Sequence, residues 1–160
     1  MRRLFTLLLL VNISLLGYSQ SMKSRTVLNK FVLGYDSERS LSDKVGFDEL
    51  SVYYEYDGKA ELSKITIDQY QYKMGVVKVE LILINDELYS VRYYPNNDRA
   101  FQRYVKYLNT EFNILGYVRQ SWFNEVVEIN YEIDGNYNES FVHYYIPLLK
   151  KYPQYKNLAF

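Results

Sequence analysis

The side chains that could perform catalysis are few in this chain. The sequence contains one histidine, His143, and no cysteine, which excludes thiol catalysis, iron–sulfur clusters and cysteine-based zinc sites. A histidine that acts as a general base needs an acid to orient it and a nucleophile or water within reach. The residues that follow His143, Tyr144 and Tyr145, supply neither. We therefore interpret His143 as a structural residue.

Acidic residues at strand positions are the second group of candidates for catalysis. Glycoside hydrolysis requires two carboxyl groups roughly 5 to 10 Å apart in a cleft, and one of them normally has a raised pKa. The acids that fall in expected strands are Glu55, Asp68, Glu80, Glu128 and Glu132. Exposed strand faces commonly carry such acids, so a small secreted hydrolase is an alternative in which no pair is favoured.

Two groups of turn residues offer oxygen ligands for calcium. Asp57-Gly58 and the segment 134–139 (DGNYNE) resemble fragments of calcium-binding loops, but neither has the full loop with a bidentate acid at its end. Asp-Gly is the pair that tight hairpin turns require, so we interpret both segments as turns. Residues 138–140 (Asn-Glu-Ser) fit the N-glycosylation pattern, and we interpret them as part of the second turn. The sequence predicts no catalytic, cofactor-binding or metal-binding residue.

Tyrosine is the most unusual feature of the composition, with 19 tyrosines beside eight phenylalanines and one tryptophan. Three adjacent pairs fall in expected strands: Tyr53-Tyr54, Tyr93-Tyr94 and Tyr144-Tyr145. Neighbours on a strand point to opposite faces, so each pair places one ring toward the core and one away from it. Outward rings aligned across strands would form an aromatic strip able to stack on sugars or to anchor another protein. The alternative is cross-strand packing on a partly covered sheet.

The elements that position these residues are mainly β-hairpins. Alternating or continuous apolar patterns predict strands over 50–56, 61–72, 76–84, 88–94, 125–133 and 140–146. Asp57-Gly58 and Asn85-Asp86 have the composition of the tight turns between them. Residues 26–35 are expected to form a first strand or an extended segment, and residues 117–123 a strand or its approach. The tail after Pro147 is expected to begin with one helical turn and then to lie along the surface.

Two helices are expected. Residues 37–45 predict a short helix with Ser37 as its cap and Gly46 as its stop. A longer helix is predicted from about 98 to 115, capped by Asn97 or Asp98 within the polar run 96–98, and followed by Gly116. Its apolar stripe consists of Phe101, Tyr104, Val105, Leu108, Phe112 and Leu115. Its opposite side carries Arg99, Arg103 and Lys106, which we interpret as a solvated helix face rather than a site for an acidic partner or a lipid headgroup.

These elements together predict an α+β fold, in which antiparallel β-hairpins form one sheet and a single long helix packs across it. The order of elements between Val76 and Ile133 resembles that of small exported bacterial α+β domains, which supports the same fold class. There is no linker, repeat or low-complexity tract, so residues 21–160 are expected to be a single domain.

The N-terminal segment MRRLFTLLLLVNISLLGYSQ (residues 1–20) has the pattern of a secretory signal. Arg2 and Arg3 precede an apolar run, residues 4–16, that is shorter than the about 20 residues needed to span a bilayer. Gly17 and Ser19 are the small residues typical of a cleavage site. We expect a cleavable signal and a periplasmic or secreted location, in preference to an uncleaved anchor or a buried core segment.

Charge and composition narrow the function of the exported domain. The chain has 19 basic and 19 acidic residues, and removal of residues 1–20 takes away Arg2 and Arg3. The resulting net charge of about −2 gives no concentrated positive field for nucleic acid. We expect a non-catalytic domain that binds a protein or glycan, without a cofactor. The alternatives are the hydrolase above and a soluble inhibitor or immunity-type protein, which would show aromatic residues ringed by acids.

Overall fold

The structure is a computed structural model that describes residues 22–46, 51–72, 75–114 and 121–156. The described elements are β1 (Thr26–Val27), β2 (Phe31–Val32), α2 (Glu38–Val45), β3 (Ser51–Tyr56), β4 (Glu61–Tyr72), β5 (Gly75–Ile84), β6 (Glu87–Tyr94), α3 (Asp98–Glu111), β7 (Asn113–Ile114), β8 (Ser121–Phe123), β9 (Val127–Ile133), β10 (Glu139–Tyr145), α4 (Ile146–Lys151) and the 3-10 turn η2 (Pro153–Tyr155). The predicted signal, residues 1–20, lies outside this part of the chain and remains a prediction. No helix among the described residues is long and apolar enough to cross a bilayer.

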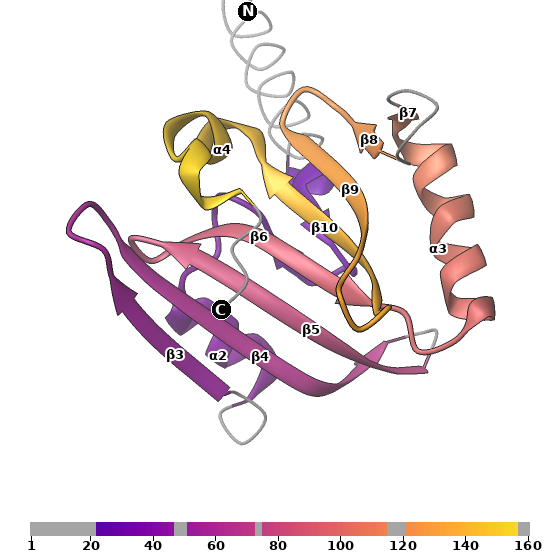
Figure 1. The fold of residues 1–160 in the computed structure, drawn as a ribbon, viewed down its shortest axis with the longest axis horizontal. Helices are drawn as coiled ribbons and strands as arrows, with labels where there is room; N and C mark the ends of the chain where they lie inside the picture. Colours follow the sequence, from indigo (N-terminus) through magenta and orange to yellow (C-terminus); the bar gives the residue numbers. More distant parts are fainter. Residues whose placement is uncertain (1–21, 47–50, 73–74, 115–120, 157–160) are drawn as a thin grey trace, which may run out of the picture.

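The predicted α+β fold is confirmed. Eight of the described strands form one sheet in the order β3-β4-β5-β6-β10-β9-β8-β7, and all of its neighbours are antiparallel. Figure 1 shows β3 at one edge of this sheet and α3 beside the other end. Asn85 and Asp86 form the β5–β6 turn with φ of 50° and 60°, the left-handed conformation that a two-residue hairpin turn needs.

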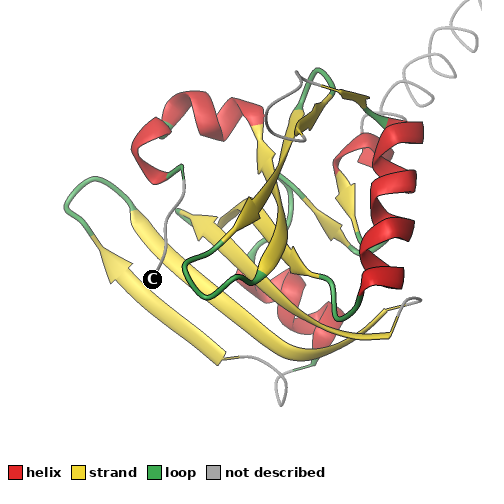
Figure 2. Cartoon of the chain, turned by 45° about the vertical axis from the view of Figure 1, so that its right-hand side comes forward, coloured by secondary structure: helices red, strands yellow, loops and turns green. Residues whose placement is uncertain are grey.

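The two faces of the sheet are defined by cross-strand register. One row across the inner face consists of Ile65, Leu81, Val91, His143 and Ile129. The parallel row across the outer face consists of Thr66, Glu80, Arg92, Val142 and Asn130. The β1–β2 hairpin, α2 and α3 pack on the inner face and close the main core, and Figure 2 shows helices on both sides of the twisted strands.

The long helix is shorter than predicted. The side chain of Asn97 caps α3 by accepting a hydrogen bond from the Ala100 amide at 2.9 Å, but the helix ends at Glu111 rather than near residue 115. Phe112 is extended (φ −131°, ψ 154°), and β7 then pairs with β8. The apolar period misled because Phe112 packs against the main core from an extended backbone. Gly116 lies outside the described residues.

The N-terminal segment is also more folded than predicted. Residues 26–35 form the β1–β2 hairpin, because Leu28 and Asn29 adopt left-handed φ of 53° and 58°. Helix α2 begins and ends where the sequence indicates: Ser37 caps it in a reciprocal box with Ser40, and Gly46 ends it.

A buried carboxylate, that of Asp36, joins the two parts of this segment. It accepts hydrogen bonds from the Val32 amide at 2.7 Å and the Ser40 hydroxyl at 3.0 Å. It also pairs with Lys44 at 2.6 Å. The Asp36 carboxylate therefore joins the β1–β2 hairpin directly to α2.

The C-terminal tail begins with the helix α4, as predicted, and covers one end of the outer face. Pro147 lies in the first turn of α4, and Leu148 and Tyr155 are buried in a second cluster with Ile82, Ile84 and Tyr144. The tail leaves the centre of the outer face to charged residues. Along β9 the apolar residues Val127 and Ile129 are buried, whereas Ile133 at the end of the strand is 56% exposed.

Candidate functional site

The strand acids considered for catalysis gather on the outer face. Glu80 lies in the row with Arg92, Val142 and Asn130, and Glu128 and Glu132 lie two residues to either side of Asn130. Glu55 is on the same face at the sheet edge, opposite Leu62. Asp68 lies at the register shift in β4, where its charge reaches Lys78. The acids therefore share a face, and two of them, Glu80 and Glu132, contact the same guanidinium, that of Arg92.

Glu80 is the centre of a charged row, which we define as Lys64, Lys78, Glu80, Arg92 and Glu132. Its carboxylate lies 2.9 Å from Nζ of Lys78, 3.4 Å from Nζ of Lys64 and 3.9 Å from the Arg92 guanidinium. The guanidinium in turn pairs with Glu132 at 3.1 Å. The side chain of Glu80 is 8% exposed, so these contacts operate in a poorly hydrated setting where charge interactions are strong.

This setting keeps Glu80 ionised. Burial opposes ionisation, but hydrogen bonds from Lys78 and Tyr94, together with the charge of Lys64, outweigh it and lower the pKa of Glu80. A general acid for glycoside hydrolysis needs the opposite shift. The charged row therefore acts as a structural ion network and gives no support to the hydrolase alternative.

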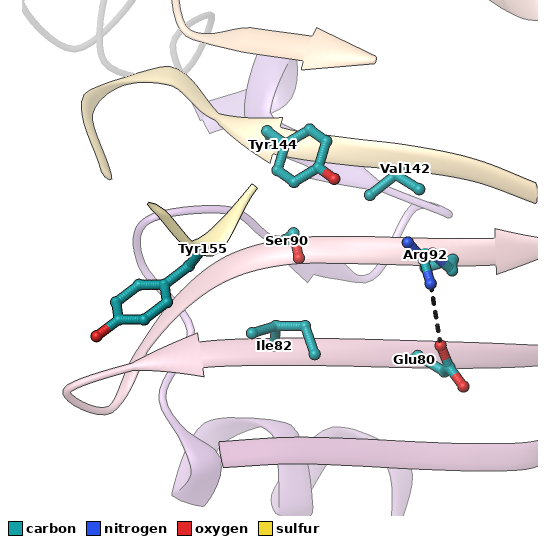
Figure 3. Close-up of a pocket in the computed structure, with 7 residues that line it drawn as sticks. All are labelled: Glu80, Ile82, Ser90, Arg92, Val142, Tyr144 and Tyr155. Carbon is teal, nitrogen blue, oxygen red and sulfur yellow. Dashed lines mark ion pairs between the residues drawn. The ribbon is translucent and has the colours of Figure 1, made fainter. Parts of the chain in front are cut away.

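A small hollow lies beside the charged row, between the strands and the C-terminal turn (Figure 3). Glu80, Arg92, Tyr144 and Tyr155 line it with Ile82, Ser90 and Val142. Its volume is about 10 Å³, the space required by a single water molecule. The hollow in this conformation is too small for a substrate.

His143 lies in the inner-face row between Val91 and Ile129 and is 2% exposed. A hydrogen bond of 2.6 Å joins its Nε2 to the hydroxyl of Tyr104 on α3. Burial lowers the pKa of His143 to about 3, so the ring is neutral in the folded protein. The contact ties α3 to β10, in agreement with the structural interpretation of this histidine.

We expect His143 to make the fold acid-sensitive. Its pKa rises from about 3 in the folded state to about 6.5 on unfolding, so its contribution is complete above pH 6.5 and is lost as the pH falls toward the folded pKa. Between pH 7 and pH 5 this amounts to about 2 kcal/mol of unfolding free energy. Urea denaturation at both pH values should show that loss in the wild type. A loss of the same size in the His143→Gln variant would contradict the assignment.

The polar turn and cap residues stabilise the backbone that carries them. Asp57 accepts hydrogen bonds from the Lys59 and Ala60 amides at 2.8 and 2.9 Å. Asp134 accepts them from the Asn136 and Asn138 amides at 2.8 and 2.9 Å, which confirms the turn interpretation. Among the described residues, no three His, Cys, Asp or Glu side chains are grouped to hold a metal ion. The predicted solvated side of α3 is confirmed, because Arg99, Arg103 and Lys106 are exposed.

The tyrosine pairs do not form the strip that the sequence suggests. Tyr93 is buried on the inner face, and Tyr94 donates a hydrogen bond to Glu80 at 3.0 Å. Tyr144, on the outer face, is buried in the cluster closed by α4 and η2. Its neighbour Tyr145 packs beside Gly34 on the other side of the sheet. Two of the three pairs therefore serve packing.

Three exposed tyrosines lie together on β3, the edge strand at the lower left of Figure 1. Tyr53, Tyr54 and Tyr56 are 55%, 54% and 72% exposed. Tyr54 and Tyr56, with Glu55 and Glu61, line a shallow hollow of about 680 Å³ at this hairpin end. That volume lies in the range of ligand-binding clefts. We name the surface of Tyr53, Tyr54 and Tyr56 the tyrosine edge.

Acidic residues surround the tyrosine edge. The Tyr54 hydroxyl donates a hydrogen bond of 2.5 Å to Glu38, at the start of α2. This hydrogen bond and the negative charges of Glu38, Glu61 and Asp86 raise the pKa of Tyr54. Glu61 is also the cross-strand partner of Tyr56. Tyr54 and Tyr56 therefore lie beside carboxylates, whereas Lys64 is the cross-strand partner of Tyr53 and Lys59 lines the hollow.

Comparison with known proteins adds no functional clue: no protein-family model matches the chain, and no curated protein is similar to it. The functional proposal therefore rests on the tyrosine edge and its acidic surroundings.

Proposed function

We propose that this protein is an exported, non-catalytic domain that binds another macromolecule, a protein or a glycan, through the tyrosine edge. The observation that carries the proposal is the exposure of three tyrosines on one edge strand, whereas Tyr89, Tyr93 and Tyr144 on the inner strands of the sheet are buried. Half-exposed tyrosines have large apolar rings with polar tips, which are enriched at binding surfaces. The predicted signal peptide supports a role outside the cytoplasm.

A second candidate is an inhibitor or immunity-type protein that blocks a basic site on an enzyme. The arrangement of Tyr54 among Glu38, Glu61 and Asp86 favours it, because aromatic anchors ringed by acids are suited to a cationic partner. Inhibition differs from simple binding in its consequence, since the partner would lose activity when bound.

The test compares residues 21–160 with a triple variant, Tyr53→Ser, Tyr54→Ser and Tyr56→Ser. Both are immobilised and exposed to envelope and culture fractions of the source cells and to a glycan array. We expect a partner that the wild type retains and that the triple variant binds roughly tenfold more weakly or not at all. The activity of a captured enzyme, measured with and without the domain, separates inhibition from simple binding.

The matched control carries Tyr107→Ser and Tyr137→Ser, which remove exposed tyrosines away from β3. This variant should retain the partner as the wild type does. Equal retention by wild type and triple variant, or retention of nothing by the wild type, contradicts the proposed function.

A further inference from the structure

Within the described part of the chain, the main chain of β3 is paired on one side, by β4. Among the described strands, β3 ends the sheet and has β4 as its neighbour. Five of its six residues are exposed, and Val52 is half-buried. A strand edge of this kind presents N–H and C=O groups that can pair with an additional strand. Proteins commonly use such edges to bind extended peptides, with the main chain giving affinity and alternate side chains giving specificity.

The side chains of β3 would meet an added strand on both faces. Tyr53 and Glu55 lie on the outer face, because Glu55 is opposite Leu62. Val52, Tyr54 and Tyr56 lie on the inner side, where Val52 is opposite Ile65. An added strand would therefore touch aromatic rings on either side, which are favourable cross-strand neighbours for aliphatic chains and the stems of long cationic ones.

Charge decides which kind of strand fits. On the inner side Glu38 accepts a hydrogen bond from the Tyr54 hydroxyl, and the Asp86 carboxylate accepts one from the Glu38 amide at 2.8 Å. Glu61 is the cross-strand partner of Tyr56. Of the nearby cations, Lys64 is engaged by Glu80 on the outer face, and Lys59 is exposed where it lines the end of the hollow. A lysine or arginine placed over Tyr54 would meet both a ring face and carboxylates.

We propose that β3 binds an extended segment of a partner protein, which adds to the sheet as a strand and presents lysine or arginine at alternate positions toward Tyr54 and Tyr56. This inference rests on the proposed function and specifies its partner. A second copy of this chain is a poorer occupant, because edge-to-edge pairing of two β3 strands would bring the two acidic surroundings together, and like charges in direct opposition are destabilising.

The probe is a capped peptide of about eight residues that alternates lysine and valine, a little longer than β3. The peptide is titrated into residues 21–160, and binding is followed by amide NMR and calorimetry. We expect the amide resonances of residues 51–56 to shift and the affinity to fall as the salt concentration is raised. A peptide with glutamate in place of lysine should bind roughly tenfold more weakly or not at all.

Two N-methylated versions of the peptide test strand addition itself. Methylation of every lysine amide blocks one edge of the added strand, and methylation of every valine amide blocks the other. We expect one version to lose roughly tenfold or more in affinity and the other to bind as the unmodified peptide does. Equal affinities of the two versions overturn strand addition.

Charge variants of the protein complete the test. The double variant Glu38→Gln with Glu61→Gln should bind the lysine peptide several-fold more weakly. The control Glu125→Gln, which replaces an exposed acid away from β3, should bind it as the wild type does. Equal binding of the glutamate peptide, no binding of the lysine peptide at about 1 mM, or self-association through β3 overturns the inference. The proposed function fails separately, if the triple tyrosine variant still captures the same partner as the wild type.

Discussion

Glu80→Gln is expected to lower the free energy of unfolding by about 3 kcal/mol. The substitution removes the anion that Lys64, Lys78 and Arg92 share on the outer face, and leaves three cations near one another. Removing one partner of a buried ion pair is strongly destabilising, because the side chains of Lys64 and Arg92, which are 17% and 19% exposed, lose the anion beside them and remain poorly hydrated. Urea denaturation at neutral pH, followed by circular dichroism, measures the change.

The matched control is Glu55→Gln, which replaces an exposed acid on the same face of the sheet. Its effect should stay below about 0.5 kcal/mol. The pH dependence gives a second readout, since the pKa of Glu80 is lowered from 4.5. Its contribution is complete above that value and is lost as the pH falls through the folded pKa. If the Glu80 and Glu55 variants lose the same stability, the charged row is not the structural network described above.

Local patterns were enough to place most of the elements. The run 61–72 is a strand with the same bounds in sequence and structure, and Asn97 and Ser37 cap the two predicted helices. In each case the signal lies within a few residues along the chain: an alternation, a cap or a turn pair. The sequence places the end of α3 too far along the chain, because an apolar residue such as Phe112 fits a helical period and an extended segment equally well.

The distribution of the tyrosines could not be read from local patterns. It depends on the pairing of β6 with β10, which joins Val91 to His143, and on the return of the tail over Tyr144. Neither contact has a local sequence signal. Only the neighbours of a strand decide whether its outward tyrosine is exposed, and β3 has a single neighbour among the described strands.

The charged row could not be derived from local patterns. A hairpin register counted from the Asn85-Asp86 turn would pair Glu80 with Val91 and would leave Arg92 on the opposite face of the sheet. The register shift between Ile82 and Leu83 brings Arg92 opposite Glu80. The contribution of Lys64 comes from β4, which pairs with the other side of β5.

Gly34→Ala is expected to destabilise the fold by about 3 kcal/mol. Gly34 has φ of +66°, and a methyl group added there would overlap the ring of Tyr145. The ring cannot simply swing away, because Arg25 lies over it at 5.6 Å and donates a hydrogen bond to its hydroxyl at 3.3 Å. Thermal and urea denaturation measure the loss. Gly58→Ala, with φ of +81° and open space around it, should cost about 1 kcal/mol from the backbone alone.

The same substitution should also weaken binding at the tyrosine edge. The Gly34 amide donates to the Leu88 carbonyl at 2.8 Å, and the Leu88 amide donates to the Asp36 carbonyl at 2.9 Å. These two bonds fasten the chain to β6 just before α2, which supplies Glu38 to Tyr54. A displaced α2 would remove a carboxylate from Tyr54 while leaving β3 paired with β4.

The double variant Gly34→Ala with Tyr145→Ala should lose less unfolding free energy than the sum of the two single variants, because the methyl group no longer overlaps a ring. Strict additivity would show that the ring of Tyr145 does not restrict residue 34.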